Sequence, residues 1–434
     1  MYILILAFTI VVDYFAGILI ESAKVQKKRK LYLVMSLVAN IGVLAFFKYF
    51  NFLNGNISGI SQSFGYTNHI PYLKILLPIG LSFHTFQAMS YTIEIYRGNF
   101  KAEKHFGIYA LYVMFYPQLV AGPIERPQNI LPQLHEKKVY QYKNVASGLR
   151  LMLWGFFKKI VIADRLGVIV DEVFKNYTHY SGISLMIATL FFTFEIYADF
   201  SGYTDIAIGS AEVMGYDLVR NFNYPFRSKN VSDYWRRWHI SLSTWFNDYL
   251  YTEILLNTRY WGKGAVVFGL LFTFFISGLW HGAGWTFIAW GLFHGVAVSY
   301  EFLTKKFRKK ISKKLPAFIY RNSSILLTFL FINFTFIFFR AENFSKAFYF
   351  LRHLFVFDNS YKALLGPNFF YHLIAGCFAI VLLEVFQGIF KNDSFNEYLS
   401  KKNTGTRWAF YIILSLAILN FGYFGGKQFI YFQF

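Results

Sequence analysis

A histidine in an apolar part of the chain is the first residue that could do chemistry. His281 lies in SGLWHGAGW, residues 277–285, a glycine-rich break between apolar runs at residues 266–276 and 287–298. Neither run contains Lys, Arg, Asp or Glu. A titratable ring in hydrocarbon is costly and usually faces a substrate, a partner or a protein-lined cavity. A buried imidazole is expected to be neutral, so His281 could act as a general base, a role typically worth about 10² to 10⁴ in rate.

The alternative for His281 is a histidine that only fills a packing position. Its apolar surroundings and its neighbours favour a site instead, because glycines permit close approach of a substrate or of backbone. These neighbours are Gly278, Gly282, Gly284, Trp280 and Trp285.

A second stretch, residues 220–251, is too charged to face lipid. Arginine forks in a basic cleft would suit a phosphorylated donor, such as a coenzyme A thioester or a phosphopantetheinyl carrier protein. The alternative is that the arginines follow the positive-inside rule and the tryptophans form an interfacial belt. The candidate donor-binding residues are Arg227, Trp235, Arg236, Arg237 and Trp238.

Other titratable residues in apolar surroundings are expected to be mainly structural. His239 follows Trp238, and a hydrogen-bonded structural role is favoured from its neighbours alone. The same holds for His84. Asp199 and Asp205 interrupt an apolar stretch, and they are expected to pair with the arginines downstream rather than to act in catalysis.

The composition indicates the class of protein that positions these residues. Of 434 residues, 56% are hydrophobic and 15% are charged, which is too apolar for an ordinary soluble protein. The net charge of +20 is concentrated after apolar spans, at residues 24–30 and 305–314, so it indicates cytoplasmic loops rather than a nucleic-acid site. Cys377 is the only cysteine, so neither a disulfide nor a thiolate metal site within the chain is expected, and no metal is predicted.

The apolar runs predict an all-α, polytopic membrane protein with about eleven transmembrane helices, since a bilayer needs roughly 20 apolar residues per helix. Residues 201–264 are mixed in polarity and predict short or re-entrant helices packed within protein. No polar linker divides the chain, so residues 1–434 are expected to form a single membrane domain. The predicted spans are residues 3–20, 31–50, 73–95, 106–121, 146–170, 183–200, 265–280, 285–300, 325–339, 369–390 and 408–424.

The positions of the basic runs predict an orientation. With residues 24–30 and 305–314 in the cytoplasm, Met1 and the uncharged loop at residues 51–68 lie outside. The break at His281 is then reached from the outer side of the membrane.

Several motifs together resemble the membrane-bound O-acyltransferase (MBOAT) superfamily, and within it the bacterial alginate O-acetyltransferase branch. The two longest are SGLWHGAGW followed by WGLFHG at residues 290–295, and WRRWHISLSTWFNDY at residues 235–249. Others are LPIGLSFH at 77–84, GPIERP at 122–127, DFSGYTD at 199–205 and FIYFQF at 429–434. Members of this branch usually begin with a further apolar stretch before the segment that starts here at Met1.

The resemblance implies a helical MBOAT fold around a central tunnel, with His281 as the catalytic histidine and His239 as a second functional histidine. It implies an acyl donor entering from the cytoplasm, an acceptor hydroxyl outside, and a separate periplasmic SGNH-type partner. Acetyl-CoA or another acyl thioester is the expected donor substrate, and no bound cofactor is expected. The residues expected to line or support the tunnel are Trp280, Gly282, Asp199, Asp205 and His84.

We therefore expect an enzyme of the cytoplasmic (inner) membrane that moves an acyl group, with acetyl favoured, for O-acetylation of an extracytoplasmic polysaccharide or peptidoglycan. One alternative is transfer of D-alanine from a carrier protein to teichoic acid. An alternative of another class is a transporter or flippase, whose intramembrane histidines and acids would bind a polar solute or relay protons. A structural subunit of a secretion complex is a third possibility, for which the histidines would be replaceable.

Overall fold

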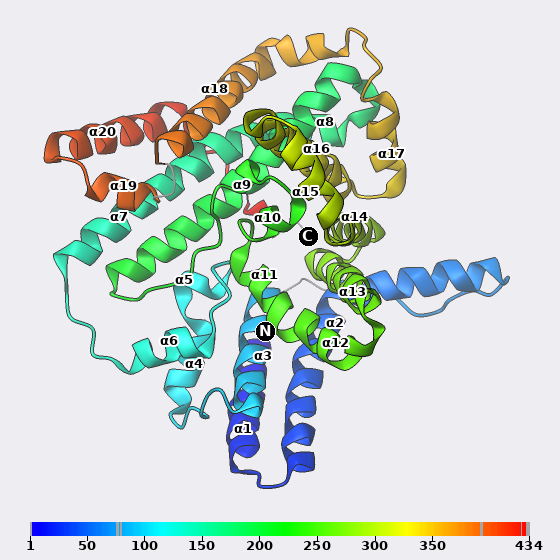
Figure 1. The fold of residues 1–434 in the computed structure, drawn as a ribbon, viewed down its shortest axis with the longest axis vertical. Helices are drawn as coiled ribbons and strands as arrows, with labels where there is room; N and C mark the ends of the chain where they lie inside the picture. Colours follow the sequence, from blue (N-terminus) through cyan, green and yellow to red (C-terminus); the bar gives the residue numbers. More distant parts are fainter. Residues whose placement is uncertain (1, 75–77, 79, 391–393, 427, 431–434) are drawn as a thin grey trace. The chain divides into compact units, whose positions relative to one another are not determined.

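The computed structural model describes residues 2–74, 78, 80–390, 394–426 and 428–430. All regular secondary structure among these residues is helical, as expected (Figure 1). Six of the described helices are long and apolar enough to cross a membrane: α1, α2, α9, α13, α16 and α18. The protein is therefore a multi-pass, all-helical membrane protein, and the number of about eleven spans stays a prediction.

The chain divides into two compact units, and whether they form the single predicted domain stays a prediction. The first unit comprises Met1–Val145 and Ser210–Val219, and the second comprises Ala146–Gly209 and Arg220–Phe434. The helices that begin in the first unit are α1 Tyr2–Ser22, α2 Gln26–Ser63, α3 Leu81–Arg97, α4 Phe106–Met114, α5 Tyr116–Leu119, α6 Pro127–His135 and α7 Tyr142–Phe156.

The second unit holds most of α7 and all later helices, apart from the last residues of α9. Short 3-10 or π-helical turns, labelled η1 to η6, join several of them. The helices are α8 Asp164–Lys175, α9 Gly182–Val213, α10 Val231–Trp235, α11 Ile240–Phe246, α12 Thr252–Thr258, α13 Lys263–His281, α14 Trp285–Leu303, α15 Lys305–Lys314, α16 Ala317–Arg340, α17 Phe344–His353, α18 Pro367–Phe390, α19 Phe395–Ser400 and α20 Thr404–Phe421.

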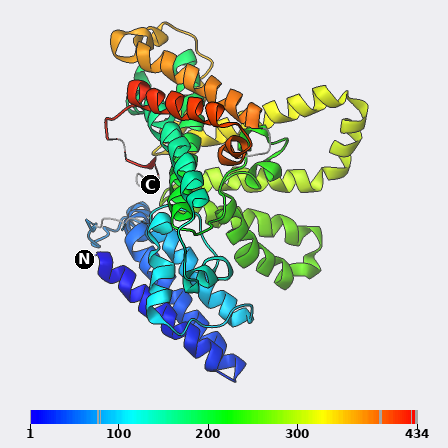
Figure 2. The ribbon, with the colours of Figure 1, turned by 90° about the vertical axis from the view of Figure 1, so that its left-hand side faces the viewer.

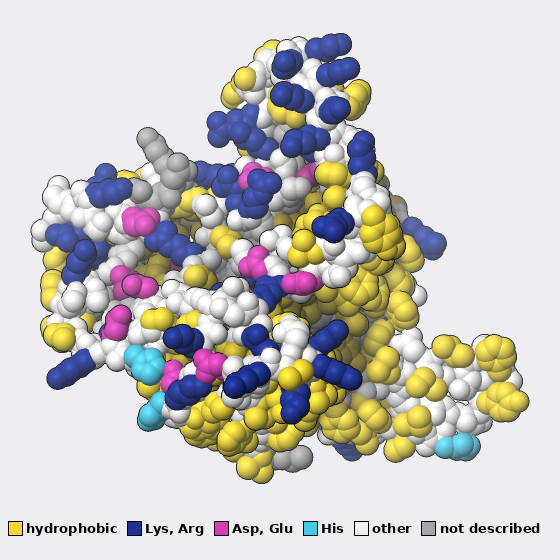
Figure 3. Space-filling view, turned by 60° about the horizontal axis from the view of Figure 1, so that its bottom comes forward, with side chains coloured by type: hydrophobic (Ala, Val, Ile, Leu, Met, Phe, Trp, Pro, Cys, Tyr) yellow, Lys and Arg dark blue, Asp and Glu magenta, His cyan; other side chains and the backbone are white. Residues whose placement is uncertain are grey.

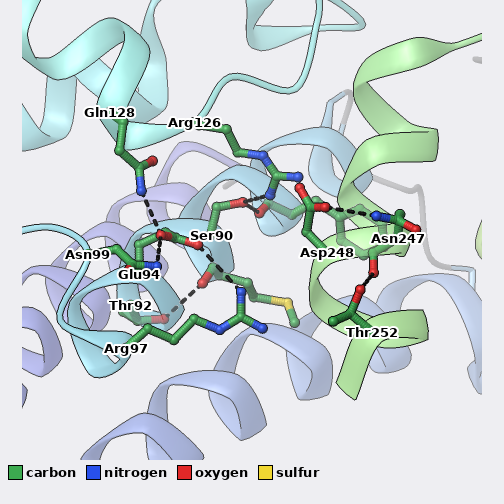
Figure 4. A network of polar contacts seen from close by, with 12 residues as sticks. Ser90, Thr92, Glu94, Arg97, Asn99, Arg126, Gln128, Asn247, Asp248 and Thr252 are labelled. Carbon is green, nitrogen blue, oxygen red and sulfur yellow. Dashed lines mark hydrogen bonds and ion pairs between the residues drawn. The ribbon is translucent and has the colours of Figure 1, made fainter. Parts of the chain in front are cut away.

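In the first unit, α1, α2 and α3 pack together, and polar side chains join them. The buried Asp13 carboxylate of α1 accepts hydrogen bonds from Ser36 Oγ at 2.6 Å and Asn40 Nδ2 at 2.8 Å, both on α2. Glu94 of α3 accepts from Gln128 Nε2 at 2.6 Å (Figure 4). Because a polar group in an apolar interior is costly without a partner, these contacts fix how the helices pack.

Two predicted boundaries in the first unit are wrong. The loop expected at residues 51–68 is largely helical, because α2 continues to Ser63. Its polar asparagines are satisfied by the returning chain, since Asn54 Nδ2 donates to the Ile70 carbonyl at 3.0 Å and Asn51 Nδ2 to the Leu73 carbonyl at 2.8 Å. The span expected from residue 73 begins only at Leu81, where Gly80 adopts a left-handed conformation with φ 78°.

Two other predicted spans also differ from the structure, one because it is interrupted and one because it is longer. The span expected at residues 106–121 is broken into α4 and α5 near Pro117. The span expected to end at residue 200 continues as α9 to Val213, so this part of the mixed region is one long helix. Downstream of it the expected short helices are present, as η3, α10, α11, η4 and α12.

In the second unit, α13 and α14 pack closely against each other. A Cβ on Gly291 would lie 2.2 Å from the Phe274 carbonyl oxygen, and one on Gly278 would lie 2.4 Å from the Phe287 carbonyl oxygen. Both distances are shorter than real contacts, so only glycine allows this approach. Figure 2 shows α15, in yellow, joining α14 to α16, which pack against each other.

The basic run at residues 305–314 forms α15, which has no buried residue. Figure 3 shows Lys and Arg side chains at the top, at the left and in the lower part of the view, with hydrophobic areas among them and a large one at the right.

Candidate active site

His281 is the last residue of α13 and is buried, with 3% of its surface exposed. Its Nδ1 lies 2.7 Å from the Ser277 carbonyl oxygen, one turn earlier on the helix. A carbonyl oxygen can only accept, so Nδ1 carries the proton and donates it. In the neutral ring Nε2 is then the nitrogen that can accept a proton, which is the tautomer a general base needs.

Aromatic rings surround the His281 imidazole. The ring centroids of Trp290, Trp280 and Phe339 lie 4.7, 4.9 and 5.6 Å from its centroid. A Cβ on Gly282 would lie 2.2 Å from the Phe287 ring, so this glycine makes room for a side chain of the next helix. Trp280 and Gly282 lie beside His281, and their role as structural support stays a prediction.

His239 is fully buried and has an unusual backbone. It is the N-cap of α11, with φ 44° and ψ 54°. Among the described residues, only His239 and Tyr224 combine a side chain with a positive φ. Such a left-handed residue costs about 1–2 kcal/mol unless it is glycine, and strain of this kind clusters at functional sites.

Hydrogen bonds on both sides of His239 hold this strained backbone. The Ile240 amide donates to the Asn221 carbonyl at 3.0 Å, and the Ser241 amide donates to Asn221 Oδ1 at 3.1 Å. On the other side, the Asn223 amide donates to the Arg237 carbonyl at 2.9 Å. The conformation of His239 is therefore set by a segment that lies well before it in the sequence.

Trp280 connects the two histidines. Its ring centroid lies 6.1 Å from that of His239 and 4.9 Å from that of His281. Phe200 of α9 packs edge-on against His239, with 4.7 Å between the ring centroids. The second unit therefore brings together the two histidines that the resemblance marked as functional.

A cavity of about 360 Å³ lies in the second unit, bordered by α10, α11, α13 and α14. Ser277, whose carbonyl accepts from His281, is part of its wall, whereas His281 and His239 are not among its lining residues. Its lining residues are Ser232, Trp235, Arg236, Ile240, Ser243, Thr244, Phe246, Asn247, Tyr251, Leu270, Thr273, Phe274, Ser277 and Val298.

The structure separates the predicted donor-binding residues. Arg236 and Trp235 line the cavity. Arg237 instead forms an ion pair with Asp233 at 3.0 Å, and Arg227 donates to the Glu384 carbonyl at 3.2 Å. Trp238 is 1% exposed and stacks on Tyr234 with 5.5 Å between centroids, which places it in the core.

Asp199 and Asp205 are paired, as expected, but their ion pairs are with lysines, and of the downstream arginines Arg220 interacts electrostatically with Asp205. Lys159 lies 2.6 Å from Asp199, and Lys158 lies 2.6 Å from Asp205. Both lysines belong to the π-helical turn η1, Phe157–Ala163, which the sequence analysis did not identify. The adjacent lysines in an apolar span were the available signal, because an unpaired charge there would be too costly.

The remaining predicted residues lie elsewhere. His84 is buried on α3 of the first unit, so its role at the tunnel stays a prediction. Asp199 Oδ2 also accepts from the Ile430 amide at 2.7 Å, which places the start of the C-terminal motif beside α9. The last four residues of that motif, 431–434, lie outside the described residues, as do 77 and 79 of the motif at 77–84.

Comparison with known proteins places both histidines in one matched region. The family model for the membrane-bound O-acyltransferase family matches residues 105–341. The peptidoglycan O-acetyltransferase of Helicobacter pylori is 37% identical over 377 residues, which cover 80% of this chain and 68% of that protein. The probable alginate O-acetylase AlgI of Pseudomonas aeruginosa is 35% identical over 348 residues, covering 80% and 64%.

The teichoic acid D-alanyltransferase of Bacillus subtilis is more distant, at 28% identity over 286 residues that cover 64% of this chain and 72% of that protein. The chain spans about two thirds of the length of the two O-acetylating relatives. With more than half of its residues matched by the family model, and His239 and His281 both within the match, the chain belongs to the membrane-bound O-acyltransferase family.

Proposed function

We propose that this protein is an acyltransferase of the cytoplasmic (inner) membrane that takes an acetyl group from a cytoplasmic thioester for O-acetylation of an extracytoplasmic polysaccharide or peptidoglycan. The observation that carries the proposal is the hydrogen bond between His281 Nδ1 and the Ser277 carbonyl, from which the tautomer of His281 follows. Its Nδ1–H is tied to the Ser277 carbonyl, which directs Nε2 to accept a proton, and the same turn borders a cavity. The names of the two O-acetylating relatives support acetyl as the group and a cell-envelope polymer as the acceptor.

In the proposed reaction, His281 Nε2 takes the proton of the acceptor hydroxyl as its oxygen attacks the thioester carbonyl carbon. The tetrahedral intermediate then collapses, the carbon–sulfur bond breaks, and the imidazolium returns the proton to the leaving thiolate. One ester forms for each thioester consumed. A positioned base of this kind contributes typically about 10² to 10⁴ in rate.

His239 is proposed to act on the other side of Trp280, where its ring would donate a hydrogen bond to the oxyanion of the intermediate. Such preorganised donors in a water-poor site are usually a large part of catalysis. Arg236, at the cavity, is proposed to bind the phosphate of the donor, whereas Arg237 is proposed to stabilise the local fold through Asp233. A planar guanidinium suits phosphate because it donates in a fork.

The first acceptor hydroxyl is proposed to belong to a periplasmic SGNH-type partner, which would complete transfer to the polymer. The donor is proposed to be acetyl-CoA or an acetylated carrier protein. Transfer of D-alanine to teichoic acid is kept as a second candidate, because the Bacillus subtilis relative carries that name.

The test supplies native membranes with acetyl-CoA labelled in the acetyl group and measures labelled ester on protein and glycan. His281→Ala should lose transfer by at least a hundredfold, whereas His353→Ala should not, because His353 lies on α17 and stacks on Tyr349. Equal labelling by wild type and His281→Ala at equal abundance would refute the mechanism. Labelling only from a D-alanyl carrier would identify the second candidate, and solute flux without ester formation would identify a transporter.

A further inference from the structure

Two buried polar residues of α14 have no role in the proposed reaction. His294 is 1% exposed and Glu301 is 9% exposed. They are seven residues apart, which is two helical turns, so they lie on one face of α14 about 10 Å apart along its axis. Both contact α10, the short helix that begins at Val231 and ends at Trp235.

Glu301 binds the beginning of α10. Its carboxylate accepts from the Val231 amide at 2.6 Å, from the Ser232 amide at 3.0 Å and from Ser232 Oγ at 2.6 Å. The first amides of a helix have no acceptor within the helix. A carboxylate there satisfies them and interacts favourably with the positive end of the helix dipole.

His294 binds the end of α10. Trp235 Nε1–H donates to His294 Nδ1 at 3.2 Å, so Nδ1 must be the unprotonated nitrogen. Nε2 then carries the proton and donates to Thr335 Oγ1 at 3.2 Å, and that hydroxyl donates to the Ile332 carbonyl at 2.9 Å. This chain of hydrogen bonds anchors Trp235 to α16 through α14.

The part of the chain held in this way includes the cavity wall. Ser232 and Trp235 both line the cavity, and the strained His239 follows Trp235 by four residues. We propose that His294 and Glu301 hold the two ends of α10, an arrangement called the clamp below, and thereby position the acyl donor. The role toward the donor rests on the proposed function. Neither residue touches the reacting atoms in this scheme; they act through Trp235 and Ser232.

Variants of His294 test the clamp because different side chains can replace one of its two ring nitrogens at a time. Asn places an acceptor near the position of Nδ1, whereas Gln places a donor near the position of Nε2, and Phe keeps the ring without either group. In native membranes, with CoA release from acetyl-CoA as the assay, His294→Phe should raise KM about 5- to 10-fold and change kcat less, since one hydrogen bond to Trp235 is lost. His294→Gln should resemble Phe, and His294→Asn should restore most of the wild-type KM.

Glu301→Gln should also raise KM, because its amide nitrogen cannot accept from the α10 amides. His353→Phe is the matched histidine control, and its KM should equal that of the wild type. Equal KM values for His294→Phe and His294→Asn, or a fall in kcat at unchanged KM, would overturn the clamp.

A stability measurement separates failure of the clamp from failure of the proposed function. His294→Phe, Trp235→Phe and the double variant are unfolded thermally in detergent with no donor present. The clamp predicts that the double variant loses clearly less stability than the sum of the single losses, because both remove the same hydrogen bond. Additive losses would overturn the clamp whatever the wild type transfers, whereas coupled losses in a chain that releases no CoA would refute only the proposed donor.

Discussion

The left-handed backbone of His239 predicts an inverted order of stability for two small substitutions. At ordinary helical positions a protein with Gly is less stable than one with Ala by about 0.5–1 kcal/mol, because glycine loses more conformational freedom on folding. At His239, with φ 44° and ψ 54°, a Cβ carries a penalty of about 1–2 kcal/mol that glycine avoids. Both variants lose the same imidazole and its contact with Phe200, so those losses cancel in the comparison.

We therefore expect His239→Gly to be more stable than His239→Ala by roughly 1 kcal/mol. This difference is the backbone strain that glycine avoids, reduced by the larger conformational entropy of the unfolded glycine variant. The assay is denaturation of the purified chain in detergent, followed by loss of helical circular dichroism. Thr244 in α11 provides the matched control, and there the Gly variant should be the less stable of the pair.

Activity of the two His239 variants should not follow their stability. Both lack the ring that is proposed to stabilise the oxyanion, so both should lose acetyl transfer by a similar factor, about 10² to 10³. A His239→Ala variant that is as stable as His239→Gly would refute the strain at this position. Full activity in either variant would refute the proposed role of the ring.

Two further predictions concern packing and charge. Gly291→Ala should destabilise the fold by about 1–3 kcal/mol, because its Cβ would lie 2.2 Å from the Phe274 carbonyl oxygen. Gly42→Ala should not destabilise the fold, because there is open space around Gly42, and thermal unfolding of both variants checks the prediction. The Arg220 guanidinium lowers the pKa of Glu397 to about 2, so their contact stabilises the fold above roughly pH 4.3 and is lost as the pH falls toward 2. Arg220→Gln should therefore be less stable than wild type at pH 7, and the difference should shrink between pH 4 and pH 2; a constant difference over that range would contradict the ion pair.

The sequence predicted well those features that follow from the local cost of exposing polar groups to lipid. Hydropathy alone predicts α13, α14, α16 and α18 to within a few residues at most ends, because roughly 20 apolar residues in lipid have few alternatives to a helix. It was less informative at α2, which continues past its apolar part to Ser63. There the polar side chains of Asn51 and Asn54 bind the returning chain, and a hydropathy pattern does not contain that partner.

For the candidate site, the sequence by itself determined which residues were costly: a histidine between apolar runs, acids within a span, and arginines beside tryptophans. Only the tertiary structure decided their partners. It paired Asp199 and Asp205 with Lys159 and Lys158, and it brought the ring of His239 to 6.1 Å from that of Trp280, the neighbour of His281. The physical reason is that burial costs follow from residue type and local polarity, whereas the hydrogen bonds and ion pairs that offset them join segments distant in the chain.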